Sequence, residues 1–188
     1  KIAMIHGLTV GELALMINGE GWLEKGVQCD LKVISVKNYD HSMQYELPVI
    51  PSPSLPNQLS VRLYTSLCLF EGTDVSVGRG TDFPFQVLGY PNPVFGKFTF
   101  TPTTKPGMAA HVEQQYKLCY GLDLRDVNPA KAKFTLKYLL NFYSKSDFKG
   151  KFFERAAFFD KLAGTDQLRK QLIAGETEEQ IRVSWKEE

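Results

Sequence analysis

A polar, glycine-rich stretch at residues 69–81 lies between two short apolar runs. It separates these two runs, which a folded chain would bury. It contains three glycines, three hydroxyl residues, two acids and one arginine. Glycine lets a backbone adopt positive φ or approach a ligand closely. Arginine presents a planar fork that matches a carboxylate. The stretch is therefore either a solvated hairpin loop whose glycines only make turns, or one wall of a binding site.

Within this stretch, Glu71 ends the first apolar run, where partial burial would raise the pKa of its carboxyl. The glycines do not form a known nucleotide signature. A P-loop has four residues between its first glycine and a Gly-Lys pair, whereas five separate Gly72 from Gly78, and Arg79 stands in place of the lysine. A nucleotide-binding enzyme is supported by the glycines alone, so phosphate binding is the weaker use of the loop.

Length and charge exclude several classes of protein. A chain of 188 residues suggests one domain, and a net charge of +1 gives no electrostatic reason to expect nucleic acid or an anionic membrane as a partner. No apolar run approaches the length of a transmembrane segment. No signal peptide is found at Lys1, which is not a methionine, so we expect a processed or trimmed chain.

The cysteines and histidines do not predict a metal site. Cys29, Cys68 and Cys119 are far apart in sequence, which favours free thiols, although one disulfide with an odd thiol is possible. The histidines, which also lack metal-ligand spacing, are His6, His41 and His111. We expect neither a metal nor a cofactor.

Local patterns predict strands early and helices late. Thr9 and Glu12 form a capping box for a helix that ends near Asn18. Alternation predicts a strand at residues 30–36. Further strands are expected at 66–70, 83–88, 95–101 and 117–124, the last with Gly121 as a possible bulge. A short helix is expected at 58–65, and longer ones at 130–143, 152–162, 165–174 and from Thr177. We predict an α/β (α+β) fold: a mixed β-sheet with flanking helices, the helices concentrated in the C-terminal third.

Several motifs together resemble the NamZ family of exo-β-N-acetylmuramidases, which act in bacterial cell-wall turnover. They are His-Gly-Leu-Thr-Val-Gly-Glu-Leu-Ala at 6–14, Pro-Ser-Pro-Ser-Leu-Pro at 51–56, the Glu-Gly-Thr to Gly-Arg-Gly-Thr block at 71–81, Pro-Phe at 84–85 and Phe-x-Asp-Lys-Leu-x-Gly at 158–164. Family members usually carry asparagine where this chain has Ser54 and Asp74. They also begin with a Rossmann-like domain that holds a Pro-Glu-His-Gly-type motif, and this sequence has no such motif. The resemblance implies that residues 1–188 form a single domain like the family's C-terminal domain, without the N-terminal domain.

The resemblance also implies a function. The chain would be the C-terminal part of an exo-acting glycoside hydrolase that releases terminal N-acetylmuramic acid from peptidoglycan fragments, and it would be inactive without its N-terminal partner. It would work in the periplasm or outside the cell. We expect Glu71 to act as a second carboxylate and Arg79 to bind the lactyl carboxylate of muramic acid. The other expected substrate contacts are Thr73, Asp74, Ser76, Gly80, Thr81 and His6, the last of which is otherwise a structural histidine.

A different class of function stays open at this point. The chain could be a non-catalytic carbohydrate-binding or interaction module of the cell envelope. Aromatic residues in predicted loops could stack on sugar faces, or they could simply pack within those loops. These aromatic residues are Tyr39, Tyr45, Tyr90 and Phe95. Binding of muramic acid without hydrolysis would distinguish this class from the enzyme.

Overall fold

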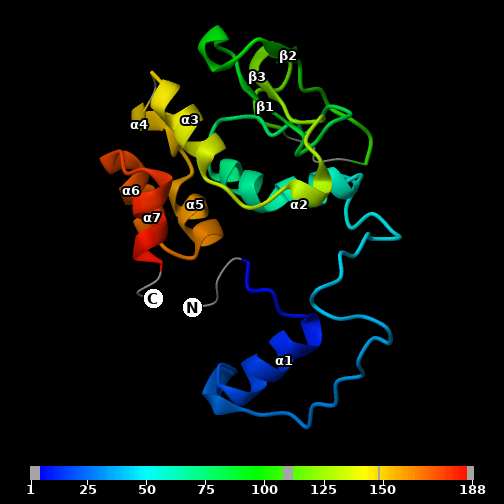
Figure 1. Ribbon diagram of the computed structural model, residues 1–188. Coiled ribbons are helices and arrows are strands. Elements are labelled where there is room, and N and C mark those ends of the chain that lie inside the picture. The colour runs from blue at the N-terminus through cyan, green and yellow to red at the C-terminus, as the bar shows by residue number, and fades with distance from the viewer. Residues whose placement is uncertain (1–4, 108–111, 148, 186–188) are drawn as a thin grey trace. The chain divides into compact units, whose positions relative to one another are not determined.

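The computed structural model describes residues 5–107, 112–147 and 149–185, and the chain divides into two units, Lys1–Tyr45 and Glu46–Glu188. In the first unit, α1 (Val10–Gly19) is followed by a 3-10 turn at Glu24–Gly26 (Figure 1). The predicted capping box is confirmed. The Glu12 amide donates to Thr9 Oγ1 at 3.2 Å, and the Thr9 amide donates to Glu12 Oε2 at 2.8 Å.

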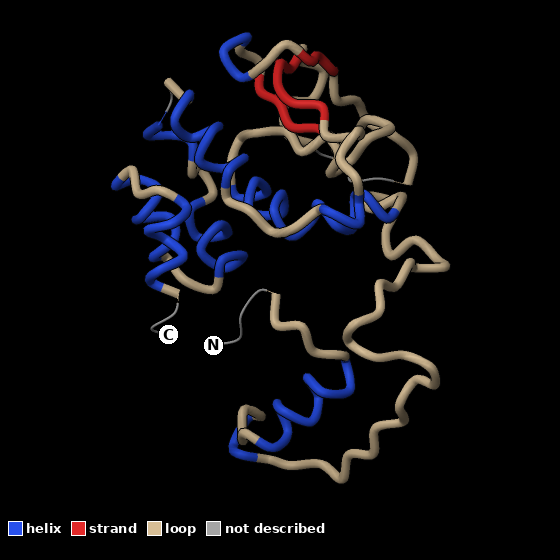
Figure 2. Tube along the Cα trace, in the orientation of Figure 1, coloured by secondary structure: helices blue, strands red, loops and turns tan. Residues whose placement is uncertain are grey.

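The strand predicted at residues 30–36 is not formed in the described part of the chain. Figure 2 draws residues 27–45 as a loop that follows the short turn. A strand forms only when its amide and carbonyl groups pair with a neighbour. The alternating sequence is present, but the first unit as described offers no neighbouring strand.

The second unit begins with a helix and continues into a small sheet. α2 (Gln58–Leu67) is capped by the Asn57 side chain, which accepts from the Ser60 amide at 2.9 Å. The strands are β1 (Val87–Tyr90), β2 (Phe98–Phe100) and β3 (Cys119–Asp123), in the order β1-β3-β2 with both pairs antiparallel. The later helices are α3 (Lys137–Lys145), α4 (Lys149–Phe152), α5 (Ala156–Ala163), α6 (Gln167–Ala174) and α7 (Glu178–Ser184).

The predicted α/β class, with helices concentrated in the C-terminal part, is confirmed. Figure 1 shows the three strands on one side of the second unit, α3 to α7 on the other, and α2 running between them. The sheet of the described residues is antiparallel throughout, where a mixed sheet was expected. Among the described residues, no helix is both long and apolar enough to cross a membrane.

Buried phenylalanines join the sheet side of the second unit to its helices. The Phe142 ring of α3 stacks on Phe95 with centroids 4.9 Å apart and meets Phe70 edge-on at 5.5 Å. The fully buried members of this aromatic core are Phe70, Phe85, Phe95, Phe142, Phe152 and Phe159. Such ring pairs stabilise a fold by more than the burial of their area alone. The residues that lead into the glycine-rich loop, which include Phe70, are therefore held by a well-packed core.

Further predicted details differ from the structure, among them the helix expected at 130–143, whose α-helical part begins only at Lys137. The strand expected at residues 66–70 is instead the end of α2 followed by a 3-10 helix, Cys68–Gly72. Leu59, Leu63 and Leu67 continue the apolar stripe of α2, so the helical period prevails over a run that could be read as strand. Gly121 is not at a bulge, because it lies opposite Gly89 in a regular ladder.

The three cysteines are free thiols, and two of them are chemically protected. Burial, with a smaller effect of the Glu71 charge, raises the pKa of Cys68 to about 11, and burial raises the pKa of Cys119 to about 12. Cys29 is exposed.

We therefore expect iodoacetamide at pH 8 to alkylate Cys29 on the order of a hundredfold faster than the other two, because the thiolate is the reactive form. Mass spectrometry of timed samples measures these rates, and the denatured chain, in which all three thiols should react, is the control. Rapid alkylation of Cys68 or Cys119 in the folded chain would contradict the buried positions.

Candidate functional site

The guanidinium of Arg79 lies between an acid and a hydroxyl. Its Nη2 donates to Glu71 Oε1 at 2.6 Å, and its Nη1 donates to Ser54 Oγ at 2.8 Å. The side chains are 25% exposed for Arg79 and 18% for Glu71, so the pair is partly shielded yet reachable from solvent. The structure thus brings together the two residues to which the sequence assigned the main chemistry.

Phe85 lies beside this pair in a strained backbone conformation. The guanidinium carbon of Arg79 is 5.0 Å from the centroid of the Phe85 ring, which is a cation–π distance. Phe85 has φ of 56°, a region that costs an L-residue about 1–2 kcal/mol. The Phe85 amide donates to the Val77 carbonyl at 2.7 Å, which helps to hold this conformation. Strain of this kind concentrates at binding and catalytic sites.

Two glycines allow the loop to turn back on itself. Gly78 and Gly80 have φ of 79° and 77°, in the left-handed region that favours glycine. A Cβ on Gly80 would meet the Thr103 carbonyl oxygen at 2.2 Å, and the Thr103 amide donates to the Gly80 carbonyl at 3.0 Å. Gly80 therefore supports the loop against a neighbouring segment of the protein.

The three hydroxyls of the loop serve its own backbone. Thr73 Oγ1 donates to the Phe70 carbonyl at 2.8 Å, and Thr81 Oγ1 donates to the Gly78 carbonyl at 2.7 Å. Ser76 Oγ accepts from the Gly78 amide at 3.2 Å. All three residues are buried. A sugar could reach these hydroxyls only if the loop opened, so the structure gives them a positioning role.

Asp74 belongs to a second group of charged residues, next to α5. Burial, then its hydrogen bond with the Glu154 carboxyl and the charge of that group, raises the pKa of Asp74. Arg155 donates to Glu113 Oε1 at 2.8 Å and to the Thr73 carbonyl at 2.6 Å. Asp74 is thus bonded to Glu154, next to the Arg155 side chain that holds the start of the loop, and its role in substrate binding stays a prediction.

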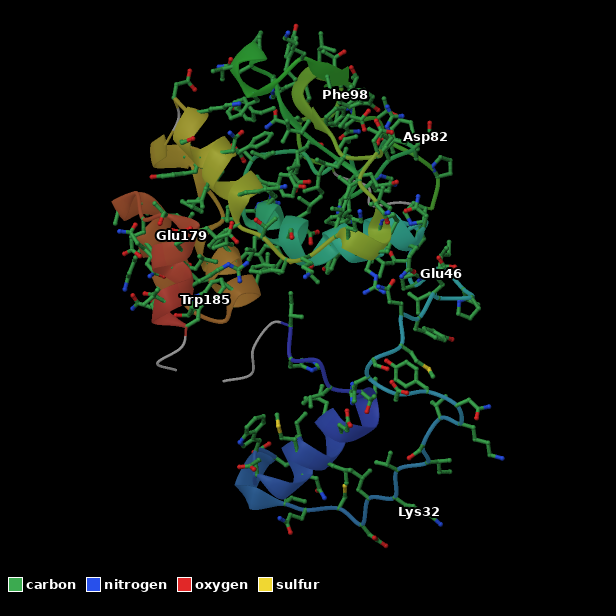
Figure 3. All side chains as sticks on the ribbon, viewed as in Figure 1. Lys32, Glu46, Asp82, Phe98, Glu179 and Trp185 are labelled. Atoms are coloured by element: carbon green, nitrogen blue, oxygen red, sulfur yellow. The ribbon has the colours of Figure 1, made fainter. Side chains whose placement is uncertain are left out.

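His6 lies in the first unit, where its Nδ1 accepts from the Leu8 amide at 3.0 Å on an exposed part of the chain. Its role in substrate binding stays a prediction. Asp82, labelled in Figure 3, directly follows the loop and forms an ion pair with Lys105. Within the described ranges, no group of three or more histidine, cysteine or acidic side chains could hold a metal ion.

Sequence reasoning did not assign three residues that complete the site. Ser54 was visible as part of the Pro-Ser-Pro-Ser motif, but its bond to an arginine 25 positions later depends on the fold. Phe85 was visible as part of the Pro-Phe motif at 84–85, but its place beside Arg79 depends on the fold. Arg155 carried no signal as a member of the site.

Two family descriptions match adjacent parts of the chain. The description "Exo-beta-N-acetylmuramidase NamZ, C-terminal" matches residues 62–188, and the corresponding N-terminal description matches residues 1–59. The second match differs from the prediction that the chain as a whole resembles the C-terminal domain. The boundary between the two matches, at residues 59–62, lies within the first half of α2.

Individual relatives agree with these matches. The chain is 31% identical to the peptidoglycan beta-N-acetylmuramidase NamZ of Bacillus subtilis (strain 168) over 98% of this chain and 47% of that protein. A crystal structure of a DUF1343 family protein from Bacteroides fragilis NCTC 9343 is 45% identical with a TM-score of 0.90, covering 97% of this chain and 52% of that one. A second DUF1343 family protein from the same strain shares the fold at 23% identity, with a TM-score of 0.76, covering 97% of this chain and 53% of that one. The chain thus spans about half the length of these relatives.

Proposed function

The chain belongs to the NamZ family of exo-β-N-acetylmuramidases, and from this we propose that it forms part of an enzyme that releases terminal N-acetylmuramic acid from peptidoglycan fragments. The supporting relative of Bacillus subtilis is a peptidoglycan beta-N-acetylmuramidase. Because such a substrate is cell-wall material, we propose a periplasmic or secreted location.

The observation that carries this proposal is the partly exposed Arg79–Glu71 pair beside Ser54. N-acetylmuramic acid differs from N-acetylglucosamine by a lactyl ether that ends in a carboxylate. A guanidinium recognises a carboxylate through two parallel charge-assisted hydrogen bonds. Two of the five N–H groups of Arg79 are engaged by Glu71 and Ser54, which fix the plane of the fork. The remaining N–H groups are the ones we assign to the lactyl carboxylate.

The ion pair with Arg79 limits which of the two carboxyl roles of a glycosidase Glu71 can take. Glycosidases use two carboxyl groups, one of which donates a proton to the leaving oxygen. A carboxylate 2.6 Å from a guanidinium nitrogen is placed to accept hydrogen bonds from sugar hydroxyls or to stabilise positive charge on the sugar ring. We assign Glu71 this accepting role, as the second carboxylate. The proton-donating acid is not assigned to any residue of this chain, so we propose that this chain alone does not turn over substrate.

The experiment offers a MurNAc-GlcNAc disaccharide to the purified chain, after circular dichroism shows that it is folded. We expect no release of N-acetylmuramic acid by the chain, and release when this chain is joined to the N-terminal half of a family member. Release by the chain alone would show that the essential carboxylates lie within it. A joined enzyme that binds N-acetylmuramic acid but never releases it would favour the carbohydrate-binding module instead.

The binding-module alternative has one specific observation in its favour. Tyr39 and Tyr45 form an edge-to-face pair, with centroids 6.2 Å apart, and both side chains are exposed. Exposed aromatic rings are suited to stacking on sugars. Of the other two aromatic candidates, Phe95 is part of the buried core and Tyr90 packs against it at 5.6 Å, so neither is presented as an open stacking surface.

A further inference from the structure

Strained backbone positions of the second unit gather around the glycine-rich loop. Among its described residues, three that are not glycine adopt the left-handed conformation, with φ of 56° at Phe85, 59° at Gln114 and 60° at Tyr116. Phe85 lies beside Arg79. Such conformations are unfavourable for residues that carry a Cβ, and they concentrate at binding and catalytic sites. The other two strained positions therefore indicate a further functional element in the segment 112–118.

Hydrogen bonds join this segment to the start of the loop. Gln114 donates from Nε2 to the carbonyl of Asp74 at 2.8 Å. The neighbouring Glu113 accepts from Arg155, which also donates to the carbonyl of Thr73. The backbone of the segment is therefore held in place by the same residues that hold the loop.

A second set of bonds joins Tyr116 to the end of the loop. The Tyr116 amide donates to the Pro102 carbonyl at 2.8 Å, and the amide of the next residue, Thr103, donates to the Gly80 carbonyl at 3.0 Å. Backbone segments joined in this way are about 5 Å apart. Tyr116 therefore lies within roughly 15 Å of Gly80, which directly follows Arg79. This separation is comparable to the length of two linked sugar rings.

The ring of Tyr116 is presented to solvent in a fixed orientation. The residue is 69% exposed, and its hydroxyl lies 3.2 Å from Thr104 Oγ1, which also accepts from Gln115 Nε2. Single exposed aromatic residues are common, but this one combines a strained backbone with a hydrogen-bonded hydroxyl. A ring that is already oriented loses little conformational entropy when a ligand stacks on it. Tyr116 is therefore suited to bind the apolar face of a sugar.

We propose that Tyr116 stacks on the sugar that follows the terminal N-acetylmuramic acid of the substrate. The inference rests on the proposed function, in which Arg79 binds the lactyl carboxylate of the terminal sugar. An exo-acting enzyme takes that terminal sugar, and the rest of the fragment continues only from its reducing end. An aromatic ring at this separation from Arg79 therefore meets the next sugar, N-acetylglucosamine. Tyr116 thus favours fragments of two or more sugars over the free monosaccharide.

The test compares two ligands by calorimetry on the joined enzyme. One is N-acetylmuramic acid, and the other is a MurNAc-GlcNAc disaccharide in which sulfur replaces the glycosidic oxygen, so that cleavage is slow. The wild type should bind the disaccharide more tightly. Tyr116→Ala should weaken binding of the disaccharide by roughly three- to tenfold, as expected for loss of one aromatic contact, and leave binding of N-acetylmuramic acid unchanged. Because the side chain is largely exposed, this variant should keep the wild-type melting temperature.

Matched variants separate stacking from other contacts. Tyr116→Phe keeps the ring and loses only the bond of the hydroxyl to Thr104, so it should retain most of the affinity for the disaccharide. Tyr116→Leu keeps an apolar side chain without an aromatic face and should behave like the alanine variant. Ile173→Ala shortens a side chain of α6 that is 54% exposed, and it should leave both affinities unchanged.

Chemical labelling reports on the ring without measuring affinity. Hydrogen bonds with Thr104 and, to a smaller extent, Gln115 lower the pKa of Tyr116, which favours the phenolate that tetranitromethane nitrates. Mass spectrometry should find Tyr116 nitrated in the joined enzyme without ligand. Saturating disaccharide should slow this nitration, whereas saturating N-acetylmuramic acid should not.

Several outcomes would overturn the inference and leave the proposed function standing. An equal loss of affinity for both ligands in Tyr116→Ala would show that this residue does not bind the second sugar, and no loss for either would show that the ring does not contact the substrate. Absence of nitration at Tyr116 in the joined enzyme without ligand would show that other polypeptide covers the ring. A joined enzyme that binds neither ligand would overturn the proposed function and this inference together.

Discussion

Replacing Arg79 with alanine should abolish the preference of the joined enzyme for N-acetylmuramic acid over N-acetylglucosamine. Each hydrogen bond to a charged group is worth about 1.5–3 kcal/mol. Losing a two-point contact to the lactyl carboxylate should therefore lower kcat/KM for muramic substrates by roughly 10²–10⁴-fold. N-acetylglucosamine lacks this carboxylate, so its binding should fall by less than about tenfold. Calorimetry with the two free sugars and turnover of the disaccharide measure both effects.

The informative quantity is the loss of affinity for N-acetylmuramic acid relative to the loss for N-acetylglucosamine. Arg79→Ala also leaves Glu71 without its partner and removes the cation above Phe85, and these changes affect any ligand. Arg79→Lys keeps the charge but loses the planar fork, so it should restore only part of the preference. Ser54→Ala removes one of the two bonds that orient the guanidinium, so it should weaken binding of muramic substrates by a small factor and leave binding of N-acetylglucosamine nearly unchanged. An equal loss of affinity for both sugars in Arg79→Ala would mean that this residue does not bind the lactyl group.

Replacing Gly121 with alanine should destabilise the second unit by roughly 3 kcal/mol or more, because the overlap involves backbone that no rotamer change relieves. A Cβ at this position would meet the Leu88 carbonyl oxygen at 1.8 Å and Gly89 Cα at 2.7 Å. The backbone of Gly96 also approaches closely, since a Cβ there would meet the Gly121 carbonyl oxygen at 2.0 Å. Urea unfolding followed by circular dichroism measures the loss.

The control is a glycine with free space around it. Gly150 lies in α4, and a Cβ there would have no atom within 4 Å. Gly150→Ala should be neutral or stabilising by up to about 1 kcal/mol, because alanine is the better helix former. A loss below about 1 kcal/mol for Gly121→Ala would show that the strands separate easily at this point.

Features with a local cause could be predicted from the sequence. The capping box at Thr9 forms as expected and the last helix starts from Thr177 as expected, because in both cases the capping partner lies three residues away. The helices that end at Gly164 and Gly175 do so with these residues in the left-handed conformation. The motif that contains Glu71 and Arg79 also pointed to the two side chains that the structure brings together.

Features with a distant cause could not be predicted. Residues 66–70 read as a strand. Leu67 continues the apolar stripe of α2, but the 3-10 helix at Cys68–Gly72 packs Phe70 against Phe142, a contact that the local sequence does not show. The hydroxyls of Thr73, Ser76 and Thr81 suggested sugar contacts, and only the course of the loop shows that they bond its own backbone. Residues 30–36 have a strand pattern, which forms a strand only where a neighbouring strand is present.

The packing of Gly72 against α5 has a consequence for how a protein of this kind changes over evolutionary time. A Cβ on Gly72 would meet the backbone nitrogen and Cα of Phe159 at 2.9 and 2.7 Å, and Arg155 holds the carbonyl of the adjacent Thr73. Glu71 thus depends for its position on a helix more than eighty residues later in the sequence. At the proposed sugar site, selection on affinity would therefore act on residues of that helix that do not belong to the site. A change at Phe159 would alter substrate preference while every residue of the loop stayed the same.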